Sequence, residues 1–190
     1  MSTWRLHRVA RALQHGAVIA YPTDTIWGLG CDPLNHTAVS RIQRLKKRPS
    51  NKGLILLGSS PEQFSRFVDL SSIQTMLDKA HEKPDKPETW IVAAASHCPT
   101  WLTSSDHSLA LRITDKPLVH ALCSTLQCPL ISTSANLSGQ PSARNSLQVR
   151  RRFQAELDFI VDDPYQHSSL NANASASRII DLRTGKILRP

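Results

Sequence analysis

The sequence contains no long hydrophobic run and few aromatic residues. No apolar stretch approaches the ~20 residues that a membrane-spanning helix needs, which excludes an integral membrane protein. Residues 1–20 interleave Arg and His with apolar positions, which does not fit a signal peptide, so we expect a cytoplasmic protein. Aromatic residues make up only 5% of the chain and are scattered, which argues against a protein that stacks bases of single strands.

Cysteines are few and carry no recognisable metal pattern. Cys31, Cys98, Cys123 and Cys128 form no CxxC pair and no zinc-binding spacing. We therefore expect reduced thiols, many of them buried, with neither a structural metal nor a disulfide.

Acidic residues are scarce in the first part of the chain. The 190 residues predict a single domain over 1–190 with a formal net charge of +8. Residues 1–52 contain nine Lys and Arg but only two acids, Asp24 and Asp32, a net charge of +7. This local excess predicts an anionic partner, which is nucleic acid, nucleotide phosphate or an acidic membrane.

Hydrophobic periodicity predicts alternating helices and strands. Helices are predicted at 4–15 (with Thr3 as N-cap and Gly16 as the stop), 37–47, 61–69, 72–83, 117–126 and 146–157. Strands are predicted at 17–21, 54–57, 90–94, 109–113, 129–132 and 158–161, with a hairpin of 179–182 and 187–188 around Thr184-Gly185. Segments 83–88 and 164–177 are expected to be loops. The alternation predicts a layered α/β fold, and the continuous apolar runs predict strands covered on both faces.

The segment from Tyr21 to Gly30 leaves a predicted strand and is interpreted as a loop. It contains Thr23, Thr25 and two glycines. Ligands of α/β sheets bind beyond the carboxyl ends of strands, which favours a ligand loop. The alternative is a turn in which the threonine hydroxyls cap backbone groups.

A basic cluster closes the predicted helix 37–47. Its members, within twelve positions and with no acid among them, are Arg41, Arg44, Lys46, Lys47, Arg48 and Lys52. A helix C-terminus favours cations, but it does not need so many. A phosphate site explains the cluster better, although the P-loop pattern GxxxxGK[ST] is absent.

Two further features point to bound anions. The segment 129–139 carries Ser132, Thr133, Ser134 and Asn136, which form either a turn or a hydrogen-bonding cradle for phosphate or ribose. No GxSxG frames these serines, which argues against a serine hydrolase. Arg112 lies within an apolar strand, where it needs an Asp partner or a ligand anion.

Taken together, five stretches resemble the YrdC-like family. They are YPTDTIWGLGCDP, LKKRPSNKGLILL, LALRITDKPLV, PLISTSANLSG and SRIIDLRTGKILRP. The resemblance runs in order from about residue 6 to residue 190. The resemblance is greatest to the short, single-domain bacterial threonylcarbamoyl-AMP synthases of the TsaC type. It implies a twisted open mixed sheet with helices packed on it and a basic concave face.

The resemblance also implies an enzyme of tRNA modification. Such a nucleotidyltransferase condenses ATP, L-threonine and bicarbonate or CO2 into L-threonylcarbamoyl-AMP and pyrophosphate. The product serves N6-threonylcarbamoyladenosine formation at position 37 of tRNAs that read ANN codons. Mg2+ is expected to accompany ATP, and separate proteins are expected to transfer the threonylcarbamoyl group. Whether the chain itself binds tRNA stays open.

The same resemblance assigns site residues. The ATP-binding set, in which Lys46 and Arg48 are the catalytic cations of a K-x-R pair, comprises Lys46, Arg48, Lys52, Ser132, Ser134, Asn136 and Arg189. The threonine-binding set comprises Thr23, Thr25, Arg112 and Ser177. Two roles are considered for Asp24, which are contact with Mg2+ and formation of the turn. Replacing Lys46 or Arg48 by alanine is expected to abolish adenylate formation while leaving the fold intact.

One stretch departs from the family pattern W-P-G-P-x-T. The aligned residues 84–89 keep only Pro87 and Thr89, which leaves an inactive paralogue as one alternative. A second alternative is a non-catalytic module that binds tRNA or double-stranded RNA through the same basic face. A third is a carbamoyl-adenylate-forming domain, which usually belongs to longer chains with zinc motifs.

Overall fold

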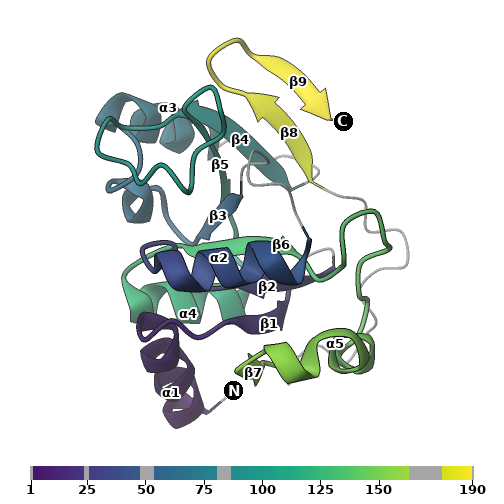
Figure 1. Cartoon of the computed structure of the whole chain (residues 1–190). Helices are drawn as coiled ribbons and strands as arrows, with labels where there is room; N and C mark the ends of the chain where they lie inside the picture. The colour runs from purple at the N-terminus through teal and green to yellow at the C-terminus, as the bar shows by residue number, and fades with distance from the viewer. Residues whose placement is uncertain (1, 24–25, 48–53, 81–86, 163–176, 190) are drawn as a thin grey trace.

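The computed structural model describes residues 2–23, 26–47, 54–80, 87–162 and 177–189 (Figure 1). The helices are α1 (Thr3–Gln14), α2 (His36–Leu45), α3 (Leu70–Ala80), α4 (Pro117–Leu126) and α5 (Ser146–Phe153), with short 3-10 turns at Pro61–Phe64 and Gln154–Glu156. The strands are β1 (Ile19–Pro22), β2 (Trp27–Gly30), β3 (Ile55–Gly58), β4 (Glu88–Ala93), β5 (Ser108–Ile113), β6 (Leu130–Ser134), β7 (Phe159–Ile160), β8 (Arg178–Asp181) and β9 (Lys186–Arg189).

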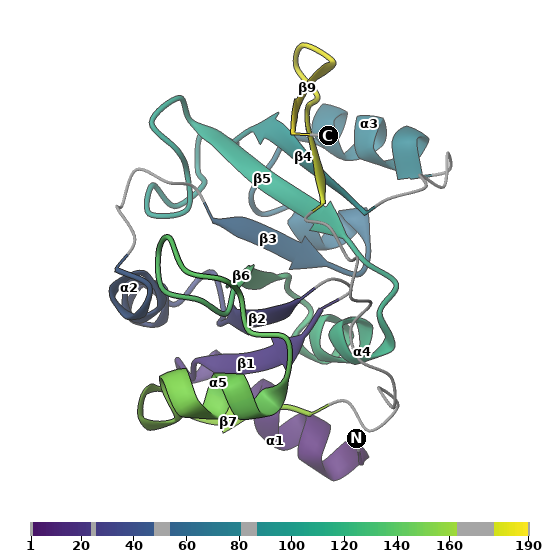
Figure 2. The same cartoon turned by 90° about the vertical axis from the view of Figure 1, so that its right-hand side faces the viewer.

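In the described part of the chain, nine strands form one twisted sheet (Figure 2). Their order is β7-β1-β2-β6-β3-β5-β4-β8-β9. The pairs β1–β7, β3–β5 and β4–β8 are parallel, and the other neighbours are antiparallel. The predicted α/β fold with an open mixed sheet is therefore confirmed.

Helices cover the sheet unevenly. On one face, α2 and α3 pack over the middle strands, and α5 packs over β1 and β2. On the other face, α1 and α4 pack together over β1 and over Leu57 and Leu130. Every residue of β1 and β2 is buried, as expected for strands covered on both faces. The expectation is wrong for β4 and β5, because every second residue of these strands faces a cavity instead of a helix.

Strand β2 was not predicted, since residues 21–30 were interpreted as a loop. Instead, β1 and β2 form a tight antiparallel hairpin in which Pro22 pairs with Trp27. The strand was missed because it contains Gly28 and Gly30, and glycine has low strand propensity. At Gly30 a Cβ atom would lie 2.6 Å from the carbonyl oxygen of Ile131 and 2.8 Å from Tyr21 Cε1. Gly30 is therefore required by close packing within the sheet.

Other boundaries differ for local reasons. The N-cap of α1 is Ser2 instead of Thr3, because the Ser2 hydroxyl accepts a hydrogen bond from the Arg5 backbone N–H. Gly16 follows α1 with a φ of +88°, as expected for a helix stop. The predicted helix 61–69 is only a single 3-10 turn, and the helix from 146 ends at Phe153. Helix α4 and the β8–β9 hairpin are confirmed. Among the described helices, none has the length and apolarity to cross a bilayer.

The thiols lie in the interior. Cys31, Cys98 and Cys123 are buried and Cys128 is half-buried. Burial raises the pKa of Cys98 to about 11 and the pKa of Cys123 and Cys128 to about 12, and it also raises the pKa of Cys31. All four groups are therefore protonated at pH 8, and the thiolate is the reactive form.

We expect these thiols to react slowly with Ellman's reagent in the native protein. At pH 8 the rate should be at least about 100-fold below that of the denatured chain, because a pKa near 11 leaves very little thiolate. In guanidinium chloride all four thiols of the sequence should become reactive together. Rapid labelling of two or more thiols before denaturation would contradict the burial described above.

Candidate active site

The open part of the sheet carries a cavity of about 570 Å³. Its position follows from the alternation of side chains along each strand. On β5, Leu109 and Leu111 belong to the core beneath α2 and α3, whereas Ser108, Ala110 and Arg112 line the cavity. The same alternation brings Thr89 and Ile91 of β4 to the cavity, and the end of β6 contributes Ser132, Thr133 and Ser134.

The cavity gathers most of the predicted residues that the structure describes. These lining residues are Thr23, Arg112, Ser132, Ser134, Ser177 and Arg189. Lys46 and Asn136 are not among the lining residues, but both contact Ser134. Thr25, Arg48 and Lys52, like Asp24, lie outside the described residues.

Lys46 is buried, with 3% of its surface exposed. Its ammonium group donates hydrogen bonds to the Ser134 carbonyl, to the Asn136 carbonyl at 2.9 Å and to Asn136 Oδ1 at 3.0 Å. Its own carbonyl oxygen accepts a hydrogen bond from the Ser138 N–H at 3.0 Å. The end of α2 and the turn after β6 are therefore one unit, which joins the K-x-R and S-x-N motifs. Because Lys46 holds this turn, we expect its loss to lower stability, and retention of the fold without it stays a prediction.

Arg112 is a buried cation in the cavity wall, with 8% of its surface exposed. It lies opposite Leu57 in the parallel pairing of β3 and β5. Burial raises the pKa of the neighbouring Tyr21 phenol, while the positive charge of Arg112 acts in the opposite direction. A guanidinium held in a cavity of this kind is suited to bind a carboxylate or phosphate through charge-assisted hydrogen bonds.

Ser177 and Arg189 contact each other, although the resemblance assigned them to different substrates. Arg189 donates to the Ser177 carbonyl from Nε at 2.9 Å and from Nη2 at 2.6 Å. The Ser177 hydroxyl lies 2.8 Å from Thr89 Oγ1, and Thr89 is fully buried. Burial lowers the pKa of Arg189. Thr89, one of two residues kept from the altered family stretch, therefore helps to fix this part of the wall.

Thr23 closes a turn and also lines the cavity. Its hydroxyl donates to the Ile26 carbonyl at 2.6 Å and so closes the turn between β1 and β2. It also lines the cavity beside Gly28, where a Cβ atom would lie 3.1 Å from Thr23 Cγ2. The absence of a side chain at Gly28 keeps this part of the cavity open.

Several lining residues were not predicted. They are Ser104, Asp106, Ser108 and Arg183, which the chain brings from two distant turns. Nothing in the local sequence marks them, because Asp106 and Arg183 are separated by 77 residues. Only the strand order of the sheet brings them together.

The fold and the cavity together define a class of protein. The class is an α/β protein whose open mixed sheet carries arginines and hydroxyl groups in one cavity, which suits an anionic ligand. The chain belongs to the Sua5/YciO/YrdC family, whose sequence model, described as "Telomere recombination", matches residues 11–190.

Named relatives match over the whole chain. The threonylcarbamoyl-AMP synthase of Pseudomonas fluorescens is 43% identical over 190 residues, covering 100% of this chain and 99% of the relative. That of Stutzerimonas stutzeri is 43% identical over 187 residues, covering 98% and 97%. The crystal structure of P. abyssi Sua5 complexed with L-threonine superposes with a TM-score of 0.85 at 27% identity. It covers 100% of this chain but 55% of that longer chain.

Proposed function

We propose that this chain is an L-threonylcarbamoyl-AMP synthase. As a nucleotidyltransferase it condenses ATP, L-threonine and bicarbonate or CO2 into L-threonylcarbamoyl-AMP and releases pyrophosphate. The observation that carries the proposal is the full-length 43% identity to a relative of that name. The threonine complex of P. abyssi Sua5 supports the amino-acid substrate. A non-catalytic RNA-binding module is not favoured, because the named relatives are synthases.

The threonine side of the cavity is built around Arg112. The guanidinium of this residue binds the threonine carboxylate, and the Thr23 side of the cavity receives the rest of the substrate. The neutral amine then adds to CO2, which gives a carbamate and releases a proton. One carbamate oxygen attacks the α-phosphorus of ATP in line, and the bond to pyrophosphate breaks. No nucleophilic side chain is needed for these steps.

The nucleotide side is built around Ser132, Ser134 and Arg189. Lys46 holds the Ser134–Asn136 turn. Negative charge develops on phosphate oxygens in the transition state, so fixed cations and oriented donors supply most of the stabilisation. Holding three reactants in one cavity supplies much of the rest. Arg48 and Lys52 stay predicted phosphate ligands.

The described residues do not fit a resident metal ion. Among them no three His, Cys, Asp or Glu side chains gather into a metal site, and Arg112 and Arg189 place two cations in the cavity lining. We propose that Mg2+ enters the reaction with the substrate, bound to the phosphates of ATP.

The product supplies a modification of tRNA. We infer that separate proteins transfer the threonylcarbamoyl group to N6-adenosine at position 37 of tRNAs that read ANN codons, in the cytoplasm. Binding of tRNA by this chain is not required for the adenylate-forming step.

The test is pyrophosphate release by the purified chain. We expect release with Mg·ATP, L-threonine and bicarbonate, and loss of release when any one of the three is omitted. Addition of tRNA should leave the rate unchanged. Release that persists without threonine, or no release by a folded protein that binds ATP, would overturn the proposal.

A further inference from the structure

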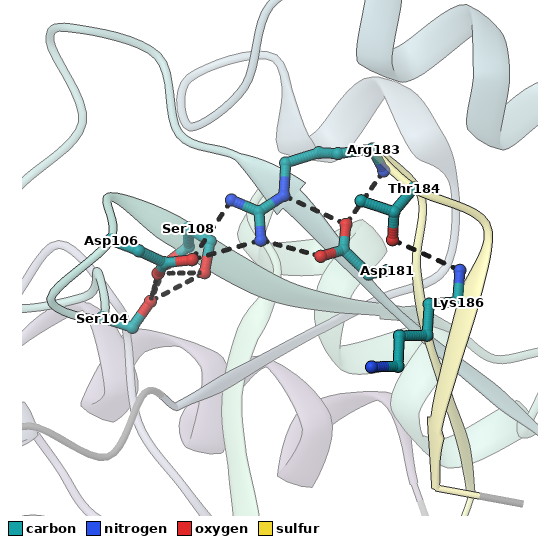
Figure 3. A network of polar contacts seen from close by, with 7 residues as sticks. All are labelled: Ser104, Asp106, Ser108, Asp181, Arg183, Thr184 and Lys186. Carbon is teal, nitrogen blue, oxygen red and sulfur yellow. Dashed lines mark hydrogen bonds and ion pairs between the residues drawn. The ribbon is translucent and has the colours of Figure 1, made fainter.

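A polar bridge joins two turns at one end of the cavity (Figure 3). Arg183, in the β8–β9 turn, donates to Asp181 from Nε at 3.0 Å and from Nη2 at 2.8 Å. It also donates to Asp106 Oδ2 from Nη1 and Nη2, both at 3.1 Å. Asp106 Oδ1 in turn accepts from the hydroxyls of Ser104 at 2.6 Å and Ser108 at 2.7 Å. The bridge thus connects the hairpin to the loop before β5.

Arg183 uses its donors on the protein. Four of the N–H···O contacts described for its side chain go to the two carboxylates, which leaves little capacity for a ligand phosphate. Hydrogen bonds from the hydroxyls of Ser104 and Ser108, and further ones from Arg183, lower the pKa of Asp106, and hydrogen bonds from Arg183 lower the pKa of Asp181. Both carboxylates are therefore ionised at neutral pH. The charges of the bridge sum to −1, which does not suit an anion site. Its geometry instead fits a structural tie.

The hairpin needs such a tie because it packs weakly. In β9, Lys186, Ile187 and Leu188 are exposed, and β9 pairs with β8 at the edge of the described sheet. Little apolar burial therefore holds this strand in place. At its open end the hairpin is fastened by the Glu88–Arg178 ion pair at 3.2 Å and by the Arg189 contacts to Ser177. At its turn, the Arg183 bridge reaches across β4 to the start of β5.

The hairpin contributes one wall of the cavity. Ile179, Leu188 and Arg189 line the cavity from β8 and β9. The pairing of the two strands is irregular next to Ile179, where Leu188 forms the extra residue of a bulge. The exposed Leu188 and the half-buried Ile179 beside the half-buried Arg189 suit a ligand that combines a flat apolar ring with phosphates. This description fits ATP better than threonine.

We propose that Arg183 is a positioning residue for the nucleotide, which acts by holding the β8–β9 hairpin against the loop before β5. Its loss lets β9 move and misplaces Leu188 and Arg189. The inference rests on the proposed function, since its readout is the use of ATP. The threonine side depends on Arg112, which lies toward the far end of β5 from Ser108, where the bridge meets this strand.

The experiment compares Arg183→Gln, Asp106→Asn and the double variant with the wild-type chain. We expect each single variant to raise KM for ATP about 5- to 10-fold, with kcat and KM for threonine within twofold. The double variant should be no worse than Arg183→Gln, because both changes break one bridge. Arg150→Gln is the matched control, because Arg150 forms an ion pair with Asp162 on the surface at 3.4 Å. It should leave both KM values unchanged.

Amide hydrogen exchange provides a readout that does not depend on activity. In Arg183→Gln the hairpin should exchange faster, including the Leu182 N–H that donates to the Ile91 carbonyl at 2.9 Å. Tm should fall by at most about 3 °C, because exposed ion pairs contribute little stability. An unchanged KM for ATP would overturn the inference. So would an equal fall of kcat/KM for ATP and for threonine that matches the fraction of unfolded protein. If the wild-type chain makes no adenylate, the proposed function fails. Hydrogen exchange tests the bridge separately, and unchanged exchange of the hairpin in Arg183→Gln would overturn it.

Discussion

Replacing Arg112 by glutamine should lower kcat/KM for L-threonine about 100-fold, because a hydrogen bond to a charged group contributes about 1.5–3 kcal/mol. Arg112 is almost fully buried in the cavity wall, so water cannot substitute well for its charge. The loss should appear mainly in KM for threonine, with KM for ATP changed less than threefold. Initial rates of pyrophosphate release at varied threonine provide the measurement.

Arg112→Lys is the companion variant. Lysine keeps the charge but not the planar fork that binds a carboxylate through two hydrogen bonds. We therefore expect it to recover part of the activity, about 10-fold above Arg112→Gln. Cooperative thermal unfolding of both variants shows that the fold is retained. A folded Arg112→Gln protein with kcat/KM for threonine within fivefold of wild type would refute the role of this residue.

Replacing Lys46 by methionine should damage both stability and activity. The change removes the hydrogen bonds of a buried ammonium group to the Ser134–Asn136 turn, and the Asn136 carbonyl loses its Lys46 donor. The Ser134 carbonyl keeps the Asn136 N–H as a donor, and Asn136 Oδ1 keeps the Ser134 hydroxyl. An acceptor left without a donor costs about 1–3 kcal/mol and a hydrogen bond to a charged group contributes about 1.5–3 kcal/mol, so the free energy of unfolding should fall by about 2–4 kcal/mol. The turn that carries Ser134 into the cavity then loses its support, and kcat/KM for ATP should fall at least about 1000-fold, in proportion to the lost electrostatic stabilisation. Denaturant unfolding and pyrophosphate release give the two measurements.

Lys47→Met is the matched control for Lys46. The two lysines are adjacent, but Lys47 is exposed, so its replacement should change neither quantity appreciably. Assays run well below the Tm of Lys46→Met keep that protein folded. If Lys46→Met were as stable as wild type, the hydrogen bonds of Lys46 to the turn would not be those described above.

The success of the fold predictions followed the strength of the local signals. Pro117 and the apolar spacing after it marked α4, and Thr184-Gly185 marked the final hairpin. Strand β2 was missed because glycine has low strand propensity, and here its use depends on the approach of β6. The segment 61–69 carried apolar residues that serve the core from a short 3-10 turn instead of from a helix.

The site was predictable where a motif and strand alternation agreed. Arg112 lies on the open face because alternate residues of β5 belong to the core, and Ser132 and Ser134 line the cavity from the end of β6. The position of Lys46 beside Ser134 was not predictable, because its partners lie about 90 residues away. The bridge of Asp106 and Arg183 likewise depends on the pairing of β4 with both β5 and β8. Such contacts exist only after the sheet is assembled.

The most direct test of the central claim is the fate of labelled bicarbonate. The purified chain is incubated with [14C]bicarbonate, L-threonine and Mg·ATP, and the nucleotide products are separated at once by chromatography and identified by mass. The account predicts one labelled adenylate that contains threonine, formed in equal amount to pyrophosphate and absent when threonine is omitted. Pyrophosphate formed without label in an adenylate, or a labelled adenylate that lacks threonine, would contradict it.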